Sequence, residues 1–461
     1  MLQRIFQLQE NRTTVRTEIL AGLTTFLTMA YIIFVQPAVL SGAMFGMKTG
    51  MSFGAVTTAT CLSAALATAI MGLYARYPIA QAPGMGQNFF FIFSAMPAAA
   101  AAGFANSWQV ALGAVFISGI LFLILSLVGV RGAVMNAISP SLQHAIAAGI
   151  GAFIAFIGLQ NAGLILKDPG TAVKLNPHFA SPDLIVFFVG LLVTAALYAR
   201  KTRGSILFGI IAATLVAMGL KYFWKGAPPD SNLIKHFAVT GKLAGLPPSI
   251  EPTFLKMDLH GALSMAMWPV IIVFLFMVFF DTVGTLVGVS EQAGLLENGK
   301  LPRARQAFVS DAVGTIAGAA LGTSTVTSYI ESAAGVEQGG RTGLTSVTVA
   351  ILFLLALFFS PLIAMVGSYA SITAPALVIV GSMMLRNAAK IDWDDFTEAF
   401  PAFLVLLGIP FSFSIADGLA LGFIAHPLLK LSSGRGKEVR WFMYLLAALL
   451  VTYFALIRAR M

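Results

Sequence analysis

Three carboxylates lie inside long apolar stretches of the sequence, where a charged side chain is costly and usually faces a cavity or a partner. They are Asp281, Asp311 and Glu331. An ionised carboxylate only accepts hydrogen bonds, and a buried one is suited to exchange a proton. We therefore expect Asp281 and Glu331 to bind a solute that donates hydrogen bonds, and all three to be candidates for proton coupling. For Asp311, a structural bond to a neighbouring helix is an equally open interpretation.

The residues around two of these carboxylates are rich in hydroxyls. Thr285 lies one helical turn after Asp281 and therefore on the same helix face. Glu331 follows the stretch 323–330, which includes Ser328 and is rich in β-branched and hydroxyl side chains. Such a stretch favours a short extended conformation over a helix start.

A glycine-rich stretch in the first half of the chain, 82–89, complements these acids. Gly86 allows backbone to approach a ligand closely, and Asn88 is expected near the N-terminus of a short helix, where free N–H groups attract acceptors. Acids, an amide and backbone donors together suit a planar, neutral solute with several hydrogen-bonding groups. Basic residues, which a phosphate or sulfate carrier would need, are missing from 80–97 and 322–336. Hydroxyls and carbonyls are compatible with a sodium site, but no feature requires one, and we expect no cofactor and no metal site.

Composition places these residues in a membrane. The chain has 461 residues, of which 58% are apolar and only 10% are charged, and its mean hydropathy is +0.88. Soluble domains carry about a quarter charged residues. This deficit excludes a soluble enzyme, a disordered protein and a nucleic-acid binder, despite a net charge of +9. Cys61, the single cysteine, excludes an intramolecular disulfide.

A helix that spans a bilayer needs roughly 20 mostly apolar residues. Stretches of this kind lie near 17–41, 52–75, 106–130, 138–163, 183–199, 204–221, 262–289, 304–321, 342–366, 373–389, 396–413 and 415–431. A last apolar run, 440–457, either spans or lies along the bundle. Asp417 is expected to cap the short helix that begins after Ser414.

Two further stretches, 80–97 and 322–336, begin with Gly, Pro, Thr and Ser and are helix-like for only a few turns. If both cross the membrane and the N-terminus is cytoplasmic, most of the 28 basic residues lie on the cytoplasmic side. We therefore expect about fourteen segments, of which the third and the tenth are broken into an extended stretch plus a half-helix, in a bacterial-type inner membrane.

The two halves of the chain, 17–221 and 262–431, resemble each other in this arrangement. Each has seven segments with the third one broken, and an odd number of spans inserts the halves in opposite orientations. Interrupted segments at matching places in two inverted halves are the best sequence indication of a transporter's binding site. The alternative is a pair of re-entrant loops with a structural role.

The stretches 18–31, 83–86, 280–282 and 322–332 resemble the AzgA-like purine permeases, a hypoxanthine/guanine/adenine branch of the nucleobase/ascorbate transporter superfamily. The likeness runs from about residue 15 to 430. It implies an all-α fold of seven plus seven inverted segments, proton-coupled uptake of a purine nucleobase, and a homodimer formed through the gate domains. The implied domains are a core (17–133 and 259–367), a gate (134–222 and 368–461) and an external loop (223–258).

The resemblance also implies roles for single residues. Asp281 and Glu331 fall where related uracil permeases carry glutamates, Thr285 falls on their histidine position, and Asn88 contributes to the purine site of the AzgA-like branch. Together with Gln87, Ser328 and Gly86, these residues make up the expected substrate site.

Three positions depart from the usual pattern of that branch. Val278 replaces an acid in the eighth segment, the stretch 86–89 reads Gly-Gln-Asn-Phe where the branch usually has Gly-Leu-Asn-Ala, and Gln36 replaces an asparagine. Gln87 could restore a hydrogen bond that the missing acid would have made. The choice of purine and the coupling ion are therefore left open.

Other functions remain as alternatives. A carrier of the same fold could transport uracil, xanthine or a small anion, and a channel is the alternative outside the carriers. An intramembrane enzyme is disfavoured, because the sequence contains neither His-Glu-x-x-His nor Gly-x-Ser-x-Gly.

Overall fold

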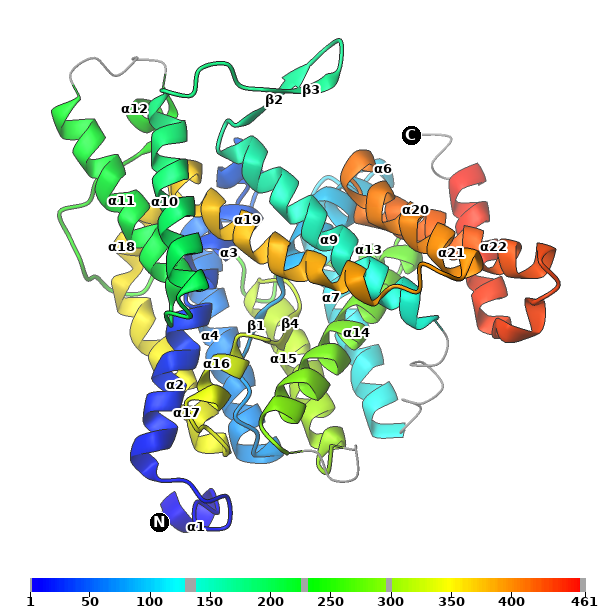
Figure 1. Ribbon diagram of the computed structural model, residues 1–461, viewed down its shortest axis with the longest axis horizontal. Coiled ribbons are helices and arrows are strands. Elements are labelled where there is room, and N and C mark those ends of the chain that lie inside the picture. Colours follow the sequence, from blue (N-terminus) through cyan, green and yellow to red (C-terminus); the bar gives the residue numbers. More distant parts are fainter. Residues whose placement is uncertain (1, 129–137, 225–230, 296–300, 457–461) are drawn as a thin grey trace.

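The computed structural model describes residues 2–128, 138–224, 231–295 and 301–456, and these are almost entirely helical (Figure 1). Within these ranges ten helical stretches are long and apolar enough to cross a membrane, and α20 (Phe396–Ser412) is a shorter apolar helix. The expected class, an all-α membrane protein, is confirmed. The expected domain boundary at 133/134 lies outside the described residues.

The helices follow the expected spans closely. In the first half they are α2 (Val15–Met29), α3 (Ile32–Leu40), α4 (Phe53–Ile70), α7 (Ser107–Val128), α9 (Pro140–Asn161), α10 (Pro182–Ala199) and α11 (Ser205–Phe223). In the second half they are α14 (Trp268–Gln292), α15 (Ala304–Leu321), α17 (Gly343–Ala356), α18 (Ser360–Gly367), α19 (Ala370–Leu385), α20 and α21 (Ile415–Ser432). α14 begins later than expected, because a short helix, α13 (Leu259–Ala262), and a turn precede it.

Local sequence explains where several helices begin. Ser139 and Ser181 precede prolines, and their side chains accept hydrogen bonds from the N–H groups of Leu142 and Leu184. A serine cap followed by proline at the first helical position is a strong start signal, since the proline has no N–H to leave unsatisfied. These starts therefore follow from the chain itself.

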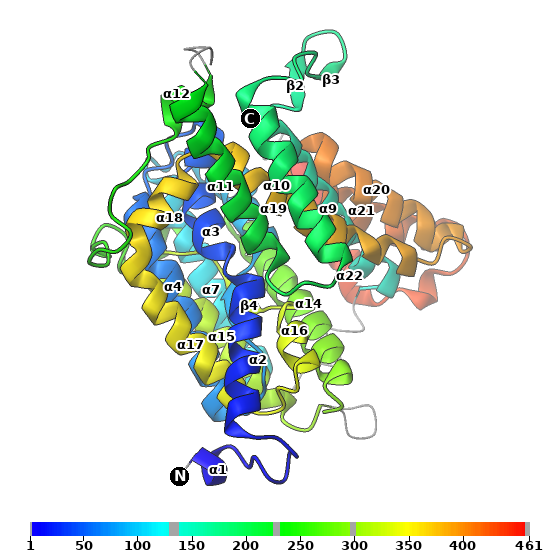
Figure 2. The ribbon, with the colours of Figure 1, turned by 60° about the vertical axis from the view of Figure 1, so that its left-hand side comes forward.

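The helices pack in two groups that Figures 1 and 2 show from two sides. In one group α9 packs on α19 and α20, α20 on α21, and α10 on α11 and α19. In the other α17 packs on α2 and α4, and α15 on α4 and α7, with α14 also against α7. The C-terminal helix α22 (Trp441–Leu456) packs on α21. Its 16 residues extend only about 24 Å, which is short for a span.

Both broken segments have the expected form. The first consists of β1 (Gln81–Pro83), α5 (Met85–Phe90), a π-helical turn η3 (Phe91–Ala95) and α6 (Met96–Ala101), and the second of β4 (Val326–Ser328) and α16 (Ser332–Glu337). β1 and β4 pair antiparallel, with Gln81 opposite Ser328 and Pro83 opposite Val326. Gly84 N donates to Thr325 O at 3.0 Å, which extends the pairing. The two irregular stretches thus satisfy each other's backbone, as membrane depth requires.

A threonine from the preceding long helix supports each of these strands. Thr68 of α4 donates to Gln81 O at 2.9 Å and accepts from Gln81 N at 2.8 Å. Thr315 of α15 donates to Val326 O at 2.8 Å. The two halves therefore fix their broken segments in the same way.

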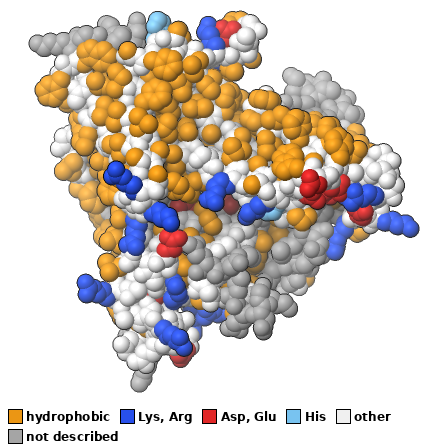
Figure 3. Space-filling model, in the orientation of Figure 1, with side chains coloured by type: hydrophobic (Ala, Val, Ile, Leu, Met, Phe, Trp, Pro, Cys, Tyr) orange, Lys and Arg blue, Asp and Glu red, His pale blue; other side chains and the backbone are white. Residues whose placement is uncertain are grey.

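Apolar side chains cover much of the surface in Figure 3, and Lys and Arg lie mainly along the lower part of that face. The exposed apolar residues include Leu192 of α10 and Leu215 of α11. A wide apolar surface of this kind suits a lipid environment. The surface therefore agrees with membrane embedding.

The closest approach between α17 and the end of the second span occurs at glycines. A Cβ atom at Gly343 would overlap the carbonyl oxygen of Gly72. We predict that Gly343→Ala separates these elements and destabilises the protein by about 1–3 kcal/mol, as overpacking does. The measurement is the fraction of monodisperse protein left after heating in detergent.

The matched control for that experiment is Gly219→Ala in α11, where an added Cβ meets no atom within 4 Å. It should be as heat-resistant as the wild type or slightly more so, because alanine favours helix. Equal heat resistance of Gly343→Ala and the wild type would contradict the packing described.

Candidate functional site

The pairing of β1 with β4 places Gln87 of α5 against Asp281 of α14. Gln87 Nε2 donates to Asp281 Oδ2 at 3.1 Å, and Gln87 is only 2% exposed. Asp281 lies near the middle of α14, yet its side chain is exposed. Because its hydrogen-bond partner Gln87 lies in a buried segment, the carboxylate points into the protein. Because the side chain is also exposed, a solute can reach it. Gln87 Oε1 has no hydrogen-bond partner and is available as an acceptor.

Glu331 lies on the other broken segment, directly before α16. The hydroxyl of Tyr31 donates to Glu331 Oε1 at 2.7 Å, and Thr28 Oγ1 lies 3.4 Å from the Glu331 carbonyl oxygen. Tyr31 is 1% exposed and sits at the bend between α2 and α3, whereas Glu331 is half-buried. α14, which carries Asp281, packs on β4 and α16, the two elements that flank Glu331, so both carboxylates belong to one region.

Asn88 links the two broken segments. It is fully buried, and its Oδ1 accepts a hydrogen bond from the hydroxyl of Ser324. Its Nδ2 is directed at Met85 Sδ, 3.9 Å away, and a thioether is a weak acceptor. The amide donor of Asn88 is therefore poorly satisfied and would gain from a stronger acceptor.

Asp311 is fully buried and occupies the junction of four elements. Its carboxylate accepts hydrogen bonds from the side chains of Gln81 in β1 and Thr282 in α14. It also accepts from Ser328 N at 3.2 Å and Ser328 Oγ at 2.8 Å in β4. The sequence left this residue between proton exchange and a structural bond, and its hydrogen bonds join β1, α14 and β4 to its own helix, α15.

The remaining expected site residues take different positions. Thr285 is buried beneath Asp281, and the hydroxyl of Ser328 is bound to Asp311. A Cβ atom at Gly86 would lie 3.0 Å from Ile150 Cγ2 of α9, so Gly86 provides a close contact between α5 and α9. Asp281, Gln87 and Glu331 are thus brought together, and the other residues lie behind or beside them.

Sequence reasoning missed several partners of the site. Tyr31, Gln81, Thr282 and Ser324 bind site residues that are distant in the chain. Tyr31 is the last residue of a stretch that carries the family resemblance. Its hydroxyl, at the end of a long apolar run, was the sequence feature that could have indicated a site residue. For the other three, no local pattern indicates the partner.

The accessible part of the site offers the carboxylates of Asp281 and Glu331, and the carbonyl oxygen of Gln87 is buried beside Asp281 without a hydrogen-bond partner. Among the described residues, no group of three or more His, Cys, Asp or Glu could hold a metal ion. This chemistry suits a solute with N–H donors, since ionised carboxylates only accept.

Comparison with known sequences places the chain among permeases. Residues 16–421 match the Permease family, Xan_ur_permease. The putative permease MJ0326 of Methanocaldococcus jannaschii is 47% identical over 456 residues, which cover 98% of each chain. The guanine/hypoxanthine permease PbuG of Bacillus subtilis is 44% identical, covering 99% of this chain and all of the relative (100%). The adenine permease AdeP of Escherichia coli is 41% identical, with coverage of 95% and 92%.

Solved structures with the same fold are more distant in sequence. The transmembrane domain of the cyanobacterial bicarbonate transporter BicA superposes with a TM-score of 0.61 at 14% identity, covering 88% of this chain and 97% of that one. SLC26A9 superposes with a TM-score of 0.66 at 11% identity, covering 94% and 68%. These similarities confirm the expected seven-plus-seven inverted-repeat fold.

The role of Asp311 can be tested by a change that keeps its shape. Asp311→Asn places an amide donor among side chains that donate to it, and each buried group left without a partner costs about 1–3 kcal/mol. We predict a large loss of thermal stability in detergent. The control is Asp168→Asn in the exposed hairpin of β2 (Ile165–Asp168) and β3 (Ala172–Leu175), which should leave stability nearly unchanged. If the Asp311→Asn protein is fully stable but its uptake of substrate no longer depends on the proton gradient, Asp311 would instead be assigned to proton exchange.

Proposed function

Because the chain belongs to the Xan_ur_permease family, we propose that it is a secondary active transporter that imports adenine, guanine or hypoxanthine together with protons. Relatives that are 44% and 41% identical over nearly the whole chain are named guanine/hypoxanthine and adenine permeases, which supports a purine substrate. The observation that carries the proposal is the pair formed by Gln87 and Asp281, with Glu331 on the broken segment that packs against the same helix.

The hydrogen-bonding pattern of a purine complements this set. Glu331 accepts N–H groups of the ring or its exocyclic amine, and Gln87 accepts through Oε1. Asn88 donates to a ring nitrogen or a carbonyl oxygen in exchange for its weak contact with Met85. Asp281 holds the solute from the opposite side and carries the coupled proton.

The transport step uses the two packing groups of helices. The core comprises 17–133 and 259–367, the gate comprises 134–222 and 368–461, and the core moves against the gate as an elevator. The packing of α9, α10, α19, α20 and α21 on one another supports this division. We further propose a dimer through the gate domains and a cytoplasmic N-terminus in a bacterial-type inner membrane.

A carrier of a small anion with the same fold is the second candidate. A bicarbonate transporter has the same fold, but at 14% identity that likeness concerns the fold alone. Against it stands Glu331, an acid, where an anion site would use a basic residue. Competition of labelled hypoxanthine uptake by adenine, guanine, xanthine, uracil and bicarbonate separates the candidates.

Proton coupling predicts that accumulation depends on the proton gradient. In cells or vesicles that contain the protein, a protonophore should abolish accumulation of hypoxanthine above equilibrium, while exchange across the membrane continues. The measurement is uptake of the labelled base with and without the protonophore, and in sodium-free buffer. Undiminished accumulation with the protonophore, or a strict need for sodium, would contradict the proposal.

Glu331 and Asp281 should respond differently to loss of charge. Glu331→Gln removes the negative charge and replaces one carboxylate oxygen, an acceptor, by an amide NH₂ group, a donor. A hydrogen bond to a charged group contributes about 1.5–3 kcal/mol, so purine affinity should fall by about tenfold or more. Asp281→Asn mimics the protonated acid and keeps an acceptor for Gln87, so binding and exchange should persist while proton-driven accumulation is lost. Equilibrium binding and counterflow measure both.

Two outcomes would overturn these assignments. A Glu331→Gln protein with unchanged purine affinity contradicts its contact with the base. An Asp281→Asn protein that still concentrates purine contradicts its part in coupling. The matched control is Glu337→Gln at the end of α16, which should bind and accumulate like the wild type.

The amides of α5 provide a test of specificity. Asn88→Ala should weaken binding of every accepted purine by about 1–3 kcal/mol, because it also leaves the Ser324 hydroxyl without its acceptor. Gln87→Leu should change the order of preference among purines, since it removes the free acceptor beside Asp281. Binding constants for adenine, guanine and hypoxanthine measure both effects. Wild-type constants in both variants would place the site elsewhere.

A further inference from the structure

A network of hydrogen bonds between buried side chains ends at Asn88. It begins at Gln36 of α3, a helix that packs on β1 and α5. Gln36 Nε2 donates to Thr323 Oγ1 at 2.8 Å and to Ser324 Oγ at 3.3 Å. The hydroxyl of Ser324 donates to Asn88 Oδ1. All four residues are 0% exposed, so bulk water does not compete for these bonds.

The donors and acceptors give this Gln36 network one direction. An amide NH₂ group only donates, so Gln36 presents hydrogens to Ser324 and the Ser324 proton cannot point back towards α3. A hydroxyl has a single proton, and that of Ser324 goes to Asn88 Oδ1. If the Asn88 amide turned over, this buried proton would lose its acceptor, which is costly. The network therefore holds Asn88 with Nδ2 directed away from Ser324, at Met85 Sδ.

The NH₂ group of Asn88 is only weakly engaged. Its contact with Met85 Sδ, at 3.9 Å, contributes little because a thioether is a poor acceptor. Met85 is 6% exposed, and the methionine side chain is flexible enough to give way to a ligand. Asn88 follows Gln87 on α5, and Gln87 binds Asp281 of the candidate site. The NH₂ group of Asn88, rather than its carbonyl oxygen, is thus the group left for a ligand.

We propose that Gln36 determines which purines the site accepts, because it fixes the amide of Asn88 through Ser324. The inference rests on the purine transport proposed above. Hypoxanthine and guanine carry an oxygen at C6, which accepts from Asn88 Nδ2, whereas adenine carries an amine at C6, which would meet another donor. A site built to hydrogen-bond one group rejects an analogue that leaves its polar groups unpaired. The Gln36 network therefore selects 6-oxopurines over adenine.

The test measures equilibrium binding of hypoxanthine, guanine and adenine to the purified full chain in detergent. We expect the wild type to bind hypoxanthine and guanine at least tenfold more tightly than adenine. Gln36→Met keeps the length of the side chain but removes the donor, and Ser324→Ala removes the link to Asn88. In both variants the Asn88 amide is free to turn over. The affinity for adenine should therefore rise while that for hypoxanthine falls, and the preference should shrink to less than threefold.

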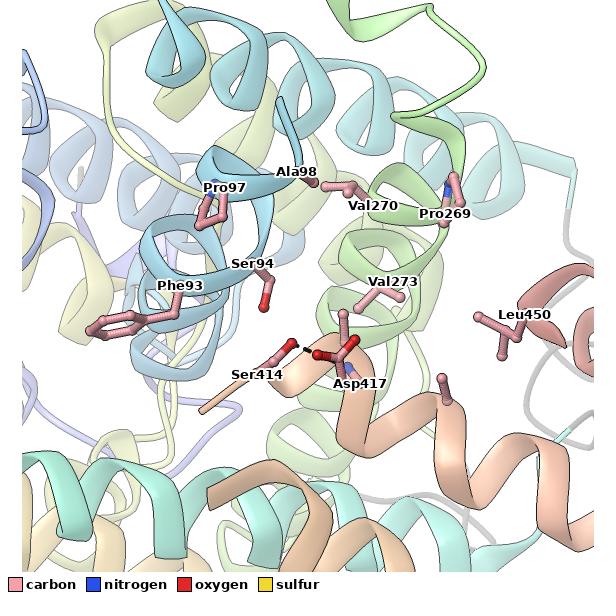
Figure 4. Close-up of a pocket in the computed structure, with 12 residues that line it drawn as sticks. Phe93, Ser94, Pro97, Ala98, Pro269, Val270, Val273, Ser414, Asp417 and Leu450 are labelled. Atoms are coloured by element: carbon pink, nitrogen blue, oxygen red, sulfur yellow. Dashed lines mark hydrogen bonds between the residues drawn. The ribbon is translucent and has the colours of Figure 1, made fainter. Parts of the chain in front are cut away.

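The matched control is Ser94→Ala, on the same broken segment as Asn88. Ser94 of η3 is 7% exposed, and its hydroxyl has no hydrogen-bond partner among the described residues. It lines a different cavity, near the start of α21 (Figure 4). Val273, which also lines that cavity, precedes Asp281 by about 12 Å along α14. Ser94→Ala therefore removes a buried hydroxyl outside the Gln36 network and should keep the wild-type preference.

The outcomes separate this inference from the proposed function. A wild type that binds adenine as tightly as hypoxanthine, or a wild-type preference in either Gln36→Met or Ser324→Ala, overturns the role of Gln36 and leaves purine transport standing. So does a parallel loss of affinity for all three bases, which a merely structural defect would cause. If Gln36→Met does not yield folded protein, Ser324→Ala against Ser94→Ala decides. A wild type that binds none of the three bases contradicts the proposed function, and this inference with it.

Discussion

Backbone that is not helical can lie within a membrane only where the protein or a water-filled cavity satisfies its hydrogen bonds, and the pairing of β1 with β4 meets this requirement through the protein itself. The partners are more than 240 residues apart in sequence, so neither half can form its broken segment alone. Both helix starts that follow, at Met85 and Ser332, are placed by this pairing. The side chains of the candidate site take their positions from it.

The buried carboxylate of Asp311 joins the strand pair to the rest of the bundle. By accepting from Gln81, Thr282 and Ser328, it connects β1, α14 and β4 to its own helix, α15. Asp281 is the residue before Thr282, so the same bond that fixes α14 also orients the accessible carboxylate. A buried acid that accepts several hydrogen bonds thus lies next in space to an acid whose side chain is exposed, and we expect the two to perform different tasks with the same functional group.

The spans and both interruptions were predictable from sequence because each depends on local composition: long apolar runs, serine–proline starts and Gly/Pro-rich breaks. Asp281 and Glu331 were predictable because an acid inside an apolar run is conspicuous. The contacts of Asn88 with Ser324 and of Glu331 with Tyr31 were not, since they join residues hundreds of positions apart. The start of α14 was placed too early because the turn before Trp268 is itself apolar.

We propose that one purine binds where the two broken segments pair, between Glu331 and Asp281. The most direct test of this proposal is an experimental structure of the protein in lipid with bound hypoxanthine. We expect density for the base within hydrogen-bonding distance of the Glu331 carboxylate and the Gln87 amide, next to the β1–β4 pair. Density for the base at another place would contradict this binding site.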